Sequence, residues 1–284
     1  MENLLRRLIP KLRLYNFRLL INLYEKYAAI RYRKKFETEI EFRGCRFVIG
    51  KDVTLFPSVY LGTYEKRELD ILQSTTFPEN LVFWDIGANV GLYSVLFGKR
   101  FSRGQIISFE PNMDLHPLLV NNFAINNISN FLIEKKALSS SSGTGEMFSE
   151  NSRPGAGRIR MESDPAKTIN KFEITTGDEY IRDHPPLIPG LIKIDVEGHE
   201  PEVIKGMAEI LSVHRPILTI EVFKNLWESE RGPLWEETLT FLFQVYGEST
   251  LVTDGQSRIL TKWGPENLTG GMQTLIFGLN NRKV

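Results

Sequence analysis

Residues 81–94 read Leu-Val-Phe-Trp-Asp-Ile-Gly-Ala-Asn-Val-Gly-Leu-Tyr-Ser, and this stretch decides the fold. An apolar run ends at Asp85, glycines follow at Gly87 and Gly91, and a helical pattern begins at Val90. Glycine has no Cβ, so the chain can turn tightly there and let a ligand approach its backbone. A strand, a glycine turn and a helix in this order predict the ligand site of an α/β nucleotide-binding fold.

The glycine spacing and the acid before it indicate which ligand the turn binds. A dinucleotide fingerprint has the form G-x-G-x-x-G and places a pyrophosphate at the helix N-terminus. Here the spacing is G-x-x-x-G, and Asp85 precedes it. A carboxylate repels a phosphate but attracts an amino-acid ammonium or a sulfonium. The turn therefore favours a cationic ligand group; the alternative is a glycine turn that serves packing alone.

The composition is that of a globular protein. The chain has 284 residues, 42% of them hydrophobic, and 35 basic residues balance 35 acidic ones. A neutral chain gives no general sign of a nucleic acid partner. The single cysteine, Cys45, leaves no internal disulfide and agrees with a reducing compartment, so we expect a cytoplasmic protein. No apolar run reaches about 18 residues, so we expect no membrane-spanning helix.

Basic residues are concentrated at the start of the chain, where ten Lys or Arg residues within residues 1–35 accompany only Glu2 and Glu25. Apolar residues recur there at spacings of three and four, which predicts a basic amphipathic helical extension over 1–38 with a break or restart at Pro10. Such a helix can bind an anionic membrane surface, here the inner one. The alternatives are that its apolar stripe packs on the main domain or forms a homodimer.

Two further segments follow the extension. Residues 39–75 are predicted to cover the core, with a hairpin around Gly44 at 39–49 and a helix at 60–74. Residues 76–284 alternate strands and helices, which indicates βαβ units and a mostly parallel sheet. The seven expected strands lie near 81–86, 105–110, 131–137, 191–196, 216–222, 249–253 and 273–279. The expected helices are 90–100, 114–127, 200–211 and 234–245.

Residues 139–169 interrupt this alternation with serines, glycines and prolines. The segment is too long for an ordinary connection between a strand and a helix. We predict a polar insertion that is either a substrate-binding lid or a solvated surface excursion.

Four acidic residues share one position in the pattern, at or near the end of a predicted parallel strand: Asp85, Glu110, Asp195 and Glu221. In open α/β sheets the ligand lies outside the carboxyl ends of the strands. Glu110 lies 19 residues beyond Gly91, where nucleotide-binding folds place the acid that accepts hydrogen bonds from the ribose. The alternative for Glu110 is a surface acid in a Glu-Pro turn. We expect the ligand site at this edge.

Four motifs occur in order along the chain: D-I-G-A-N-V-G-L-Y-S at 85–94, F-E-P at 109–111, K-I-D-V-E-G-H-E at 193–200, and R-P-I at 215–217 followed by Glu221. As a set they resemble the FkbM-type family of S-adenosylmethionine-dependent methyltransferases, over roughly residues 60–280. The resemblance implies a Rossmann-like class I methyltransferase fold: seven strands, mostly parallel with an antiparallel last strand, and helices on both faces. It also implies O-methylation of a sugar, a glycan or glycolipid, or a natural product.

The resemblance further implies how S-adenosylmethionine is bound. The first motif lines its methionine end, Glu110 binds its ribose, Ala137 and Leu138 flank its adenine, and Glu65 or Glu68 closes the pocket. The implied cofactor-binding residues are Glu68, Asp85, Gly87, Ala88, Asn89, Gly91, Tyr93, Glu110, Pro111, Ala137 and Leu138. One position departs from the family pattern: Gly177, in T-G-D-E at 176–179, stands where Leu is common, which bears on local packing.

Methyl transfer is an in-line displacement at a sulfonium carbon, so the protein must align the acceptor oxygen and remove its proton. The candidate catalytic residues are Lys193, Asp195, Glu197, His199 and Glu221. We expect Asp195 or Glu197 to act as the base, assisted by His199 or Lys193. Asp195, Glu197 and Glu221 can also present oxygen ligands to a divalent metal. Hydrogen-bonded carboxylates are the default interpretation, and we predict no metal site.

Two other functions stay open at this point. An NAD-dependent oxidoreductase would use the same sheet and Glu110, although the chain lacks the dinucleotide fingerprint. A non-catalytic scaffold, tethered to a membrane by the basic extension, would keep the fold but lose the acids at the strand ends.

Overall fold

The computed structural model describes residues 27, 30–31, 38–52, 55–148, 158–159, 171–223, 228–229, 231–253, 256–267 and 272–279. The extension predicted over residues 1–38 lies almost wholly outside the described residues. Its described members Tyr27, Ile30 and Arg31 are helical and exposed. Among the described residues, no helix is both long and apolar enough to cross a membrane.

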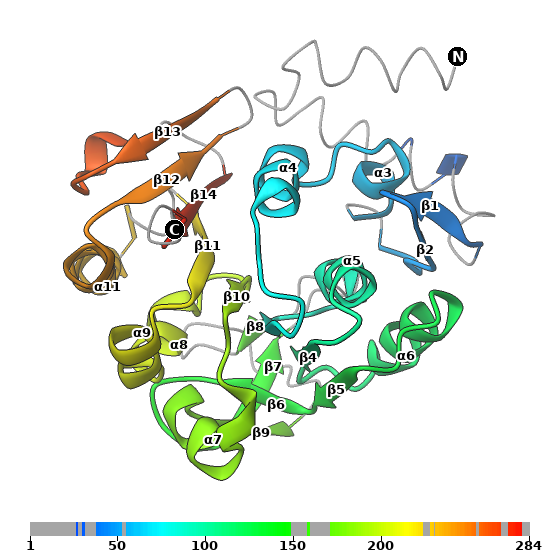
Figure 1. Ribbon diagram of the computed structural model, residues 1–284, viewed down its shortest axis with the longest axis horizontal. Coiled ribbons are helices and arrows are strands. Elements are labelled where there is room, and N and C mark those ends of the chain that lie inside the picture. The colour runs from blue at the N-terminus through cyan, green and yellow to red at the C-terminus, as the bar shows by residue number, and fades with distance from the viewer. Residues whose placement is uncertain are drawn as a thin grey trace.

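A twisted sheet of eight strands runs through the centre of the molecule in the order β13-β12-β14-β11-β10-β3-β4-β5 (Figure 1). Its parallel strands are β3 (Val82–Ile86), β4 (Gln105–Phe109), β5 (Phe131–Glu134), β10 (Leu191–Ile194) and β11 (Ile217–Phe223). The last strand, β14 (Met272–Phe277), pairs antiparallel with β11 and with β12 (Ser249–Val252). This arrangement confirms the predicted mostly parallel sheet with an antiparallel last strand.

The predicted count of seven strands is wrong by one, because β13 (Ser257–Leu260) pairs antiparallel with β12 at the edge of the sheet. Three of its four residues are exposed. A strand with so little burial lacks the alternation of apolar and polar residues that marks a strand in a sequence.

Helices cover both faces of the sheet, as predicted (Figure 1). One face carries α3 (Leu55–Tyr60), α4 (Lys66–Ser74), α5 (Leu92–Arg100) and α6 (His116–Ile125). The other carries α7 (Gly177–Asp183), α8 (Glu200–Lys205), α9 (Ala208–His214) and α11 (Gly232–Tyr246). Successive strand residues point to opposite faces, so Phe83 packs under the first set and Trp84 under the second. Short 3-10 turns occur at Pro185–Leu187 and Pro265–Asn267.

Two segments predicted as single helices are each broken. In the 60–74 segment, the left-handed residues Gly62 (φ 71°) and Glu65 (φ 36°) separate α3 from α4. In the 200–211 segment, the break follows Gly206, where an added Cβ would lie 1.9 Å from the carbonyl oxygen of Ser139. The hairpin predicted at 39–49 is present, with β1 (Ile40–Phe42) and β2 (Cys45–Phe47) joined by a turn that contains Gly44.

A second, four-stranded sheet has the order β6-β9-β7-β8. Its strands are β6 (Lys136–Leu138), β7 (Gly143–Phe148), β8 (Arg158–Ile159) and β9 (Lys171–Thr175). The predicted strand 131–137 is therefore two strands in two sheets. Within the predicted polar insertion 139–169, Gly143–Phe148 form a strand with a buried Met147. Residues 149–157 and 160–169 lie outside the described residues.

Helix α7 was missing from the predicted elements, although its N-terminal signal is in the sequence. The Thr176 side chain accepts a hydrogen bond from the Glu179 amide at 3.0 Å, and the Glu179 carboxylate faces back to the Thr176 amide as a capping box. Gly177, which departs from the family pattern, is buried against Met207, the residue before α9. A Cβ added at Gly177 would lie 2.4 Å from Met207 Cγ. Local packing therefore leaves no room for a leucine.

Candidate active site

A pocket opens beyond the carboxyl ends of β3, β4 and β10. It contains about 630 Å³ of empty space, part of it open to solvent. Its walls come from the turn after β3, the segment after β4, the loop after β10 and the small sheet, which contributes Met147. Nine of the predicted site residues line it: Gly87, Asn89, Glu110, Pro111, Ala137, Leu138, Asp195, Glu197 and His199.

The glycine turn after β3 contacts the end of β4 and the loop after β10. Gly87 has a φ of 83°, and an added Cβ would lie 1.9 Å from the backbone oxygen of Asp195. The amides of Gly87 and Ala88 donate to the carbonyl of Phe109 at 2.9 and 3.1 Å. Gly91 precedes α5 and faces Leu119 of α6, where an added Cβ would lie 2.3 Å from Cδ1. Gly87 thus lets the turn meet the loop after β10, and Gly91 serves helix packing.

Asp85 lies behind the turn and does not line the pocket. Its Oδ2 accepts hydrogen bonds from the amide of Ser94 at 2.9 Å and from the hydroxyl of Ser94 at 2.5 Å, which ties the first turn of α5 to β3. Burial raises the pKa of Asp85 to about 6. Ala88, Gly91 and Tyr93 are likewise not among the lining residues, so cofactor contacts for these four residues stay predictions.

Glu110 is held in a fixed position at the pocket wall. Its Oε2 accepts from the amide of Asn89 and its Oε1 from the amide of Asn112, both at 2.8 Å. Burial raises the pKa of Glu110 to about 7, and these two hydrogen bonds act in the opposite direction. A carboxylate has about four lone-pair sites, so two acceptor sites are left for hydroxyl groups of a ligand.

The loop after β10 is shaped by Glu200, a buried glutamate at the first position of α8. Glu200 Oε1 accepts from the amides of Val196 and Gly198, at 3.0 and 3.2 Å. The loop includes two left-handed residues, Glu197 (φ 54°) and Gly198 (φ 101°). Because Glu200 binds the loop backbone, it sets the positions of Asp195, Glu197 and His199.

His199 joins the pocket to a half-buried ion pair between Glu202 and Arg231. Its Nε2 lies 2.9 Å from Ser139 Oγ and its Nδ1 lies 3.5 Å from Glu202 Oε2. Arg231 donates to both Glu202 oxygens, at 2.7 and 2.6 Å. Burial lowers the pKa of His199 below its ordinary 6.5, so the imidazole is neutral at pH 7. A neutral imidazole beside a carboxylate is suited to accept a proton.

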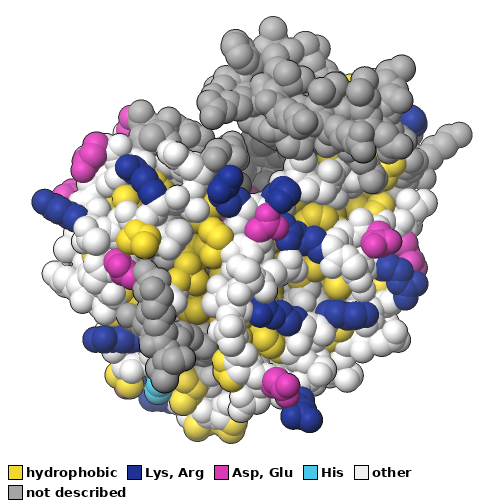
Figure 2. Space-filling view, turned by 45° about the horizontal axis from the view of Figure 1, so that its top comes forward, with side chains coloured by type: hydrophobic (Ala, Val, Ile, Leu, Met, Phe, Trp, Pro, Cys, Tyr) yellow, Lys and Arg dark blue, Asp and Glu magenta, His cyan; other side chains and the backbone are white. Residues whose placement is uncertain are grey.

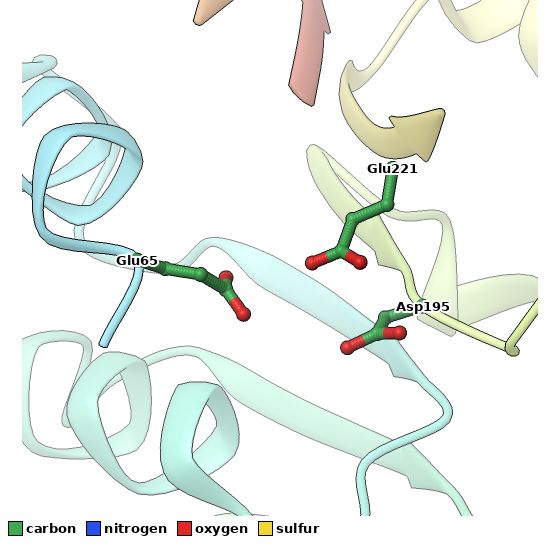
Figure 3. Close-up of side chains that lie close together, drawn as sticks. All are labelled: Glu65, Asp195 and Glu221. Carbon is green, nitrogen blue, oxygen red and sulfur yellow. The ribbon is translucent and has the colours of Figure 1, made fainter. Parts of the chain in front are cut away.

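Glu65, Asp195 and Glu221 form an acidic cluster (Figure 3). One oxygen from each carboxylate lies within 4.8 Å of the others. Asp195 belongs to both the pocket and the cluster. Glu65 was expected only to close the cofactor pocket, and its approach to Glu221 has no signal in the sequence.

Lys193, Tyr93 and Glu68 surround this cluster rather than the pocket. Lys193 donates to Asp195 Oδ2 at 2.8 Å, and its ammonium lies 4.6 Å from the centre of the Tyr93 ring. The Tyr93 hydroxyl donates to Glu65. Glu68 accepts from the hydroxyls of Thr219 and Thr274 at 2.7 and 3.0 Å. Burial, together with Glu65, raises the pKa of Glu68 to about 7.

A family model described as the methyltransferase FkbM domain matches residues 85–249, more than half of the chain. The chain belongs to this family. The match begins at Asp85 and includes both the glycine turn and the loop after β10. The family resemblance of the four motifs is thereby confirmed.

Two curated relatives are also methyltransferases. Hexuronic acid methyltransferase AglP of Haloferax volcanii is 31% identical over 160 residues, which cover 54% of this chain and 64% of the relative. Methyltransferase sdnD of Sordaria araneosa is 29% identical over 161 residues, covering 46% of this chain and 62% of the relative. The alignments thus span less than two thirds of either relative. The solved methyltransferase FkbM of Methylobacillus flagellatus KT superposes with a TM-score of 0.46 at 15% identity, covering 75% of this chain and 46% of that one.

Proposed function

We propose that this chain is an S-adenosylmethionine-dependent O-methyltransferase that acts on a hydroxyl of a sugar, a glycan or glycolipid, or a natural product. The observation that carries the proposal is Glu110, a carboxylate held by two backbone amides at the wall of the pocket. Membership of the FkbM family supports methyl transfer. The relative named as a hexuronic acid methyltransferase supports a sugar-like acceptor.

The strand order suggests how the cofactor lies. Strand β3 lies between β4 and β10. The pocket residues that follow these strands therefore form a row along the edge of the sheet, in the order Glu110, Gly87 and Asp195. The ribose hydroxyls bind Glu110, and the adenine lies against Ala137 and Leu138. The methionine half passes Gly87, and the sulfonium methyl then points to the loop after β10, where the acceptor binds.

The chemical step breaks one bond and forms another at the methyl carbon. The acceptor oxygen attacks the methyl group, the carbon–sulfur bond breaks, and S-adenosylhomocysteine leaves with the electron pair. The acceptor proton goes to a base in the loop. His199 is our candidate because it is neutral and Glu202 lies beside its other nitrogen. Asp195 and Glu197 are the alternatives, and Asp195 is already paired with Lys193.

Calorimetric titration with S-adenosylhomocysteine tests the proposal. We expect wild type to bind with a one-to-one stoichiometry and Glu110→Ala to bind roughly 10- to 100-fold more weakly, because charge-assisted hydrogen bonds to the ribose are lost. Glu41→Ala, an exposed position on β1, is the control and should bind as wild type does. No binding of S-adenosylmethionine or S-adenosylhomocysteine to wild type would reject the proposal. A screen of sugars, uronic acids and glycolipids with labelled cofactor then identifies the acceptor.

A further inference from the structure

The acidic cluster brings three carboxylates together from three separate elements. Glu65 precedes α4, Asp195 follows β10, and Glu221 lies on β11; all three side chains point toward one another (Figure 3). Their oxygens lie within 4.8 Å of one another. Like charges at this distance repel, so a positive charge among them would lower the free energy of the folded chain.

Glu221 is the member of the cluster that has no hydrogen-bond or ion-pair partner among the described residues, although Lys193 is near enough to attract it. Glu221 is 4% exposed, and none of the residues described by the structure donates a hydrogen bond to its carboxylate or forms an ion pair with it. By contrast, Asp195 pairs with Lys193 and Glu65 accepts from Tyr93. A buried carboxylate without a partner is unfavourable unless it is protonated or binds a cation.

Lys193 supplies too little positive charge for the whole group. Within the described chain, its one ion pair to these carboxylates is the contact with Asp195. That contact uses Oδ2 and leaves Oδ1 of Asp195 available. Glu68, the fourth carboxylate nearby, is satisfied by two threonine hydroxyls. A cation would therefore bind between Glu65, Asp195 and Glu221.

We propose that Glu65, Asp195 and Glu221 form a binding site for a divalent cation that prefers oxygen ligands, such as Mg²⁺, Mn²⁺ or Ca²⁺. Carboxylates are the ligands that these ions select. Ligands on opposite sides of Ca²⁺ are about 5 Å apart and those of Mg²⁺ about 4 Å apart, so the cluster accommodates either ion with small side-chain movements. Three protein ligands leave further coordination positions for water or for oxygens of a bound molecule.

The site would have a role in methyl transfer that rests on the proposed function. Asp195 also lines the pocket, so the open coordination positions would lie where the acceptor is expected. Two adjacent acceptor oxygens, as in a sugar diol or a hydroxy acid, can bind such an ion together. The ion would lower the pKa of the bound hydroxyl, and the pocket base would take its proton.

Manganese binding tests the site on the full-length, chelator-treated protein. We expect titration followed by electron paramagnetic resonance to show one Mn²⁺ site per chain. Glu221→Gln and Glu65→Gln should each weaken it by about tenfold or more, because each removes a charged ligand. Asp70→Asn is the matched control: it removes an exposed carboxylate of α4, the helix that Glu65 precedes, and should leave Mn²⁺ binding unchanged.

Two further measurements make the outcome decisive. Mn²⁺ should raise the melting temperature of wild type more than that of Glu221→Gln at the same concentration. The melting of Glu221→Gln without metal shows whether the variant folds. S-adenosylhomocysteine should bind in the presence of chelator, which separates failure of the metal site from failure of the proposed function. Wild type that binds no Mn²⁺ at millimolar concentration, or a Glu221→Gln variant that binds it equally well, would overturn the proposal and leave Glu221 as a protonated acid.

Discussion

Glu110 and Glu221 are both buried glutamates at one edge of one sheet, but their surroundings are opposite. Glu110 is 6% exposed and receives a backbone amide at each oxygen, whereas Glu221 is 4% exposed and receives no donor from the described residues. A carboxylate with fixed donors is oriented before any ligand arrives, and it binds hydroxyls. A carboxylate without donors needs a proton or a cation. The edge thus has an acidic half and a half that we propose binds the cofactor, called the cofactor half.

The loop after β10 joins the two halves. Asp195 borders both, His199 lines the pocket, and Gly87 touches the backbone of Asp195 from the cofactor half. Among the described residues on the face that Figure 2 shows, Lys and Arg side chains lie scattered between Asp and Glu side chains. The distinction between the halves concerns the buried groups, where variants can test it.

The largest effect is expected from His199→Gln. A general base contributes about 10²- to 10⁴-fold to a rate, so we expect kcat to fall by roughly 10²- to 10³-fold with the acceptor that the labelled-cofactor screen identifies. Glutamine can still hydrogen-bond to Ser139 but cannot take the proton. The affinity for S-adenosylhomocysteine, measured by calorimetry, should stay within about threefold of wild type, because Glu110 is untouched.

His214→Gln, at the end of α9, is the matched control and should keep full activity. If His199→Gln retained wild-type kcat, the base would be Asp195 or Glu197 instead. If His199→Gln also bound S-adenosylhomocysteine more weakly, His199 would contribute to both cofactor binding and the chemical step.

Gly87→Ala should damage both halves together. The new Cβ would lie 1.9 Å from the backbone oxygen of Asp195, so the turn and the loop must move apart. Overpacking of this kind costs about 1–3 kcal/mol, and we expect urea denaturation to show a loss of about 2–3 kcal/mol together with weaker cofactor binding.

Gly44→Ala is the control that separates the cost of a left-handed alanine from the cost of the steric clash with Asp195. Gly44 has a φ of 77°, close to the 83° of Gly87, but an added Cβ there meets no atom within 4 Å. The control should therefore lose only about 1 kcal/mol, the contribution of the left-handed conformation. Equal losses in the two variants would show that the contact between the turn and Asp195 does not hold the halves together.

The cofactor half was largely predictable from the sequence, because its signals are local. An apolar run, a glycine turn and a helical period lie within residues 81–100, and Glu110 follows the next strand at nucleotide-fold spacing. The small sheet was not predictable in this way. Gly143 and Gly145 are typical loop residues in a sequence, yet both lie in β7. Glycine occupies position 145 because the ring of Phe172 leaves no room for a side chain: an added Cβ would lie 2.7 Å from that ring.

The acidic half was predictable only in part. Asp195 and Glu221 follow from the strand pattern, and both were expected to face the acceptor. Glu65 joins them because α4 packs across the sheet, where Glu68 is bonded to Thr219, 151 residues away in sequence. A contact of that separation depends on tertiary packing and leaves no periodic signal. The prediction of no metal site considered Asp195, Glu197 and Glu221 but not Glu65, and it stays a prediction.

The smallest predicted effect concerns the protonation of Glu110. Burial raises its pKa to about 7 from an ordinary 4.5, so the group gains a proton as the pH falls through 7. Ribose hydroxyls donate to the ionised form, so affinity should be highest above pH 7 and decrease below it. If only the ionised form of a group with this pKa binds the ribose, the affinity for S-adenosylhomocysteine falls by about tenfold from pH 8 to pH 6, because the ionised fraction falls by that factor. Calorimetry with S-adenosylhomocysteine across this range measures the decrease.

Glu110→Gln is the control for this titration, because its amide keeps an acceptor oxygen but carries no titrating proton. Its affinity should be lower than that of wild type at pH 8 and nearly independent of pH, and the same pH dependence in both proteins would assign the titration to another group. Its Mn²⁺ affinity should equal that of wild type, because no oxygen of Glu110 belongs to the acidic cluster. Loss of the pH dependence with unchanged Mn²⁺ binding would show that the two buried glutamates serve two different ligands.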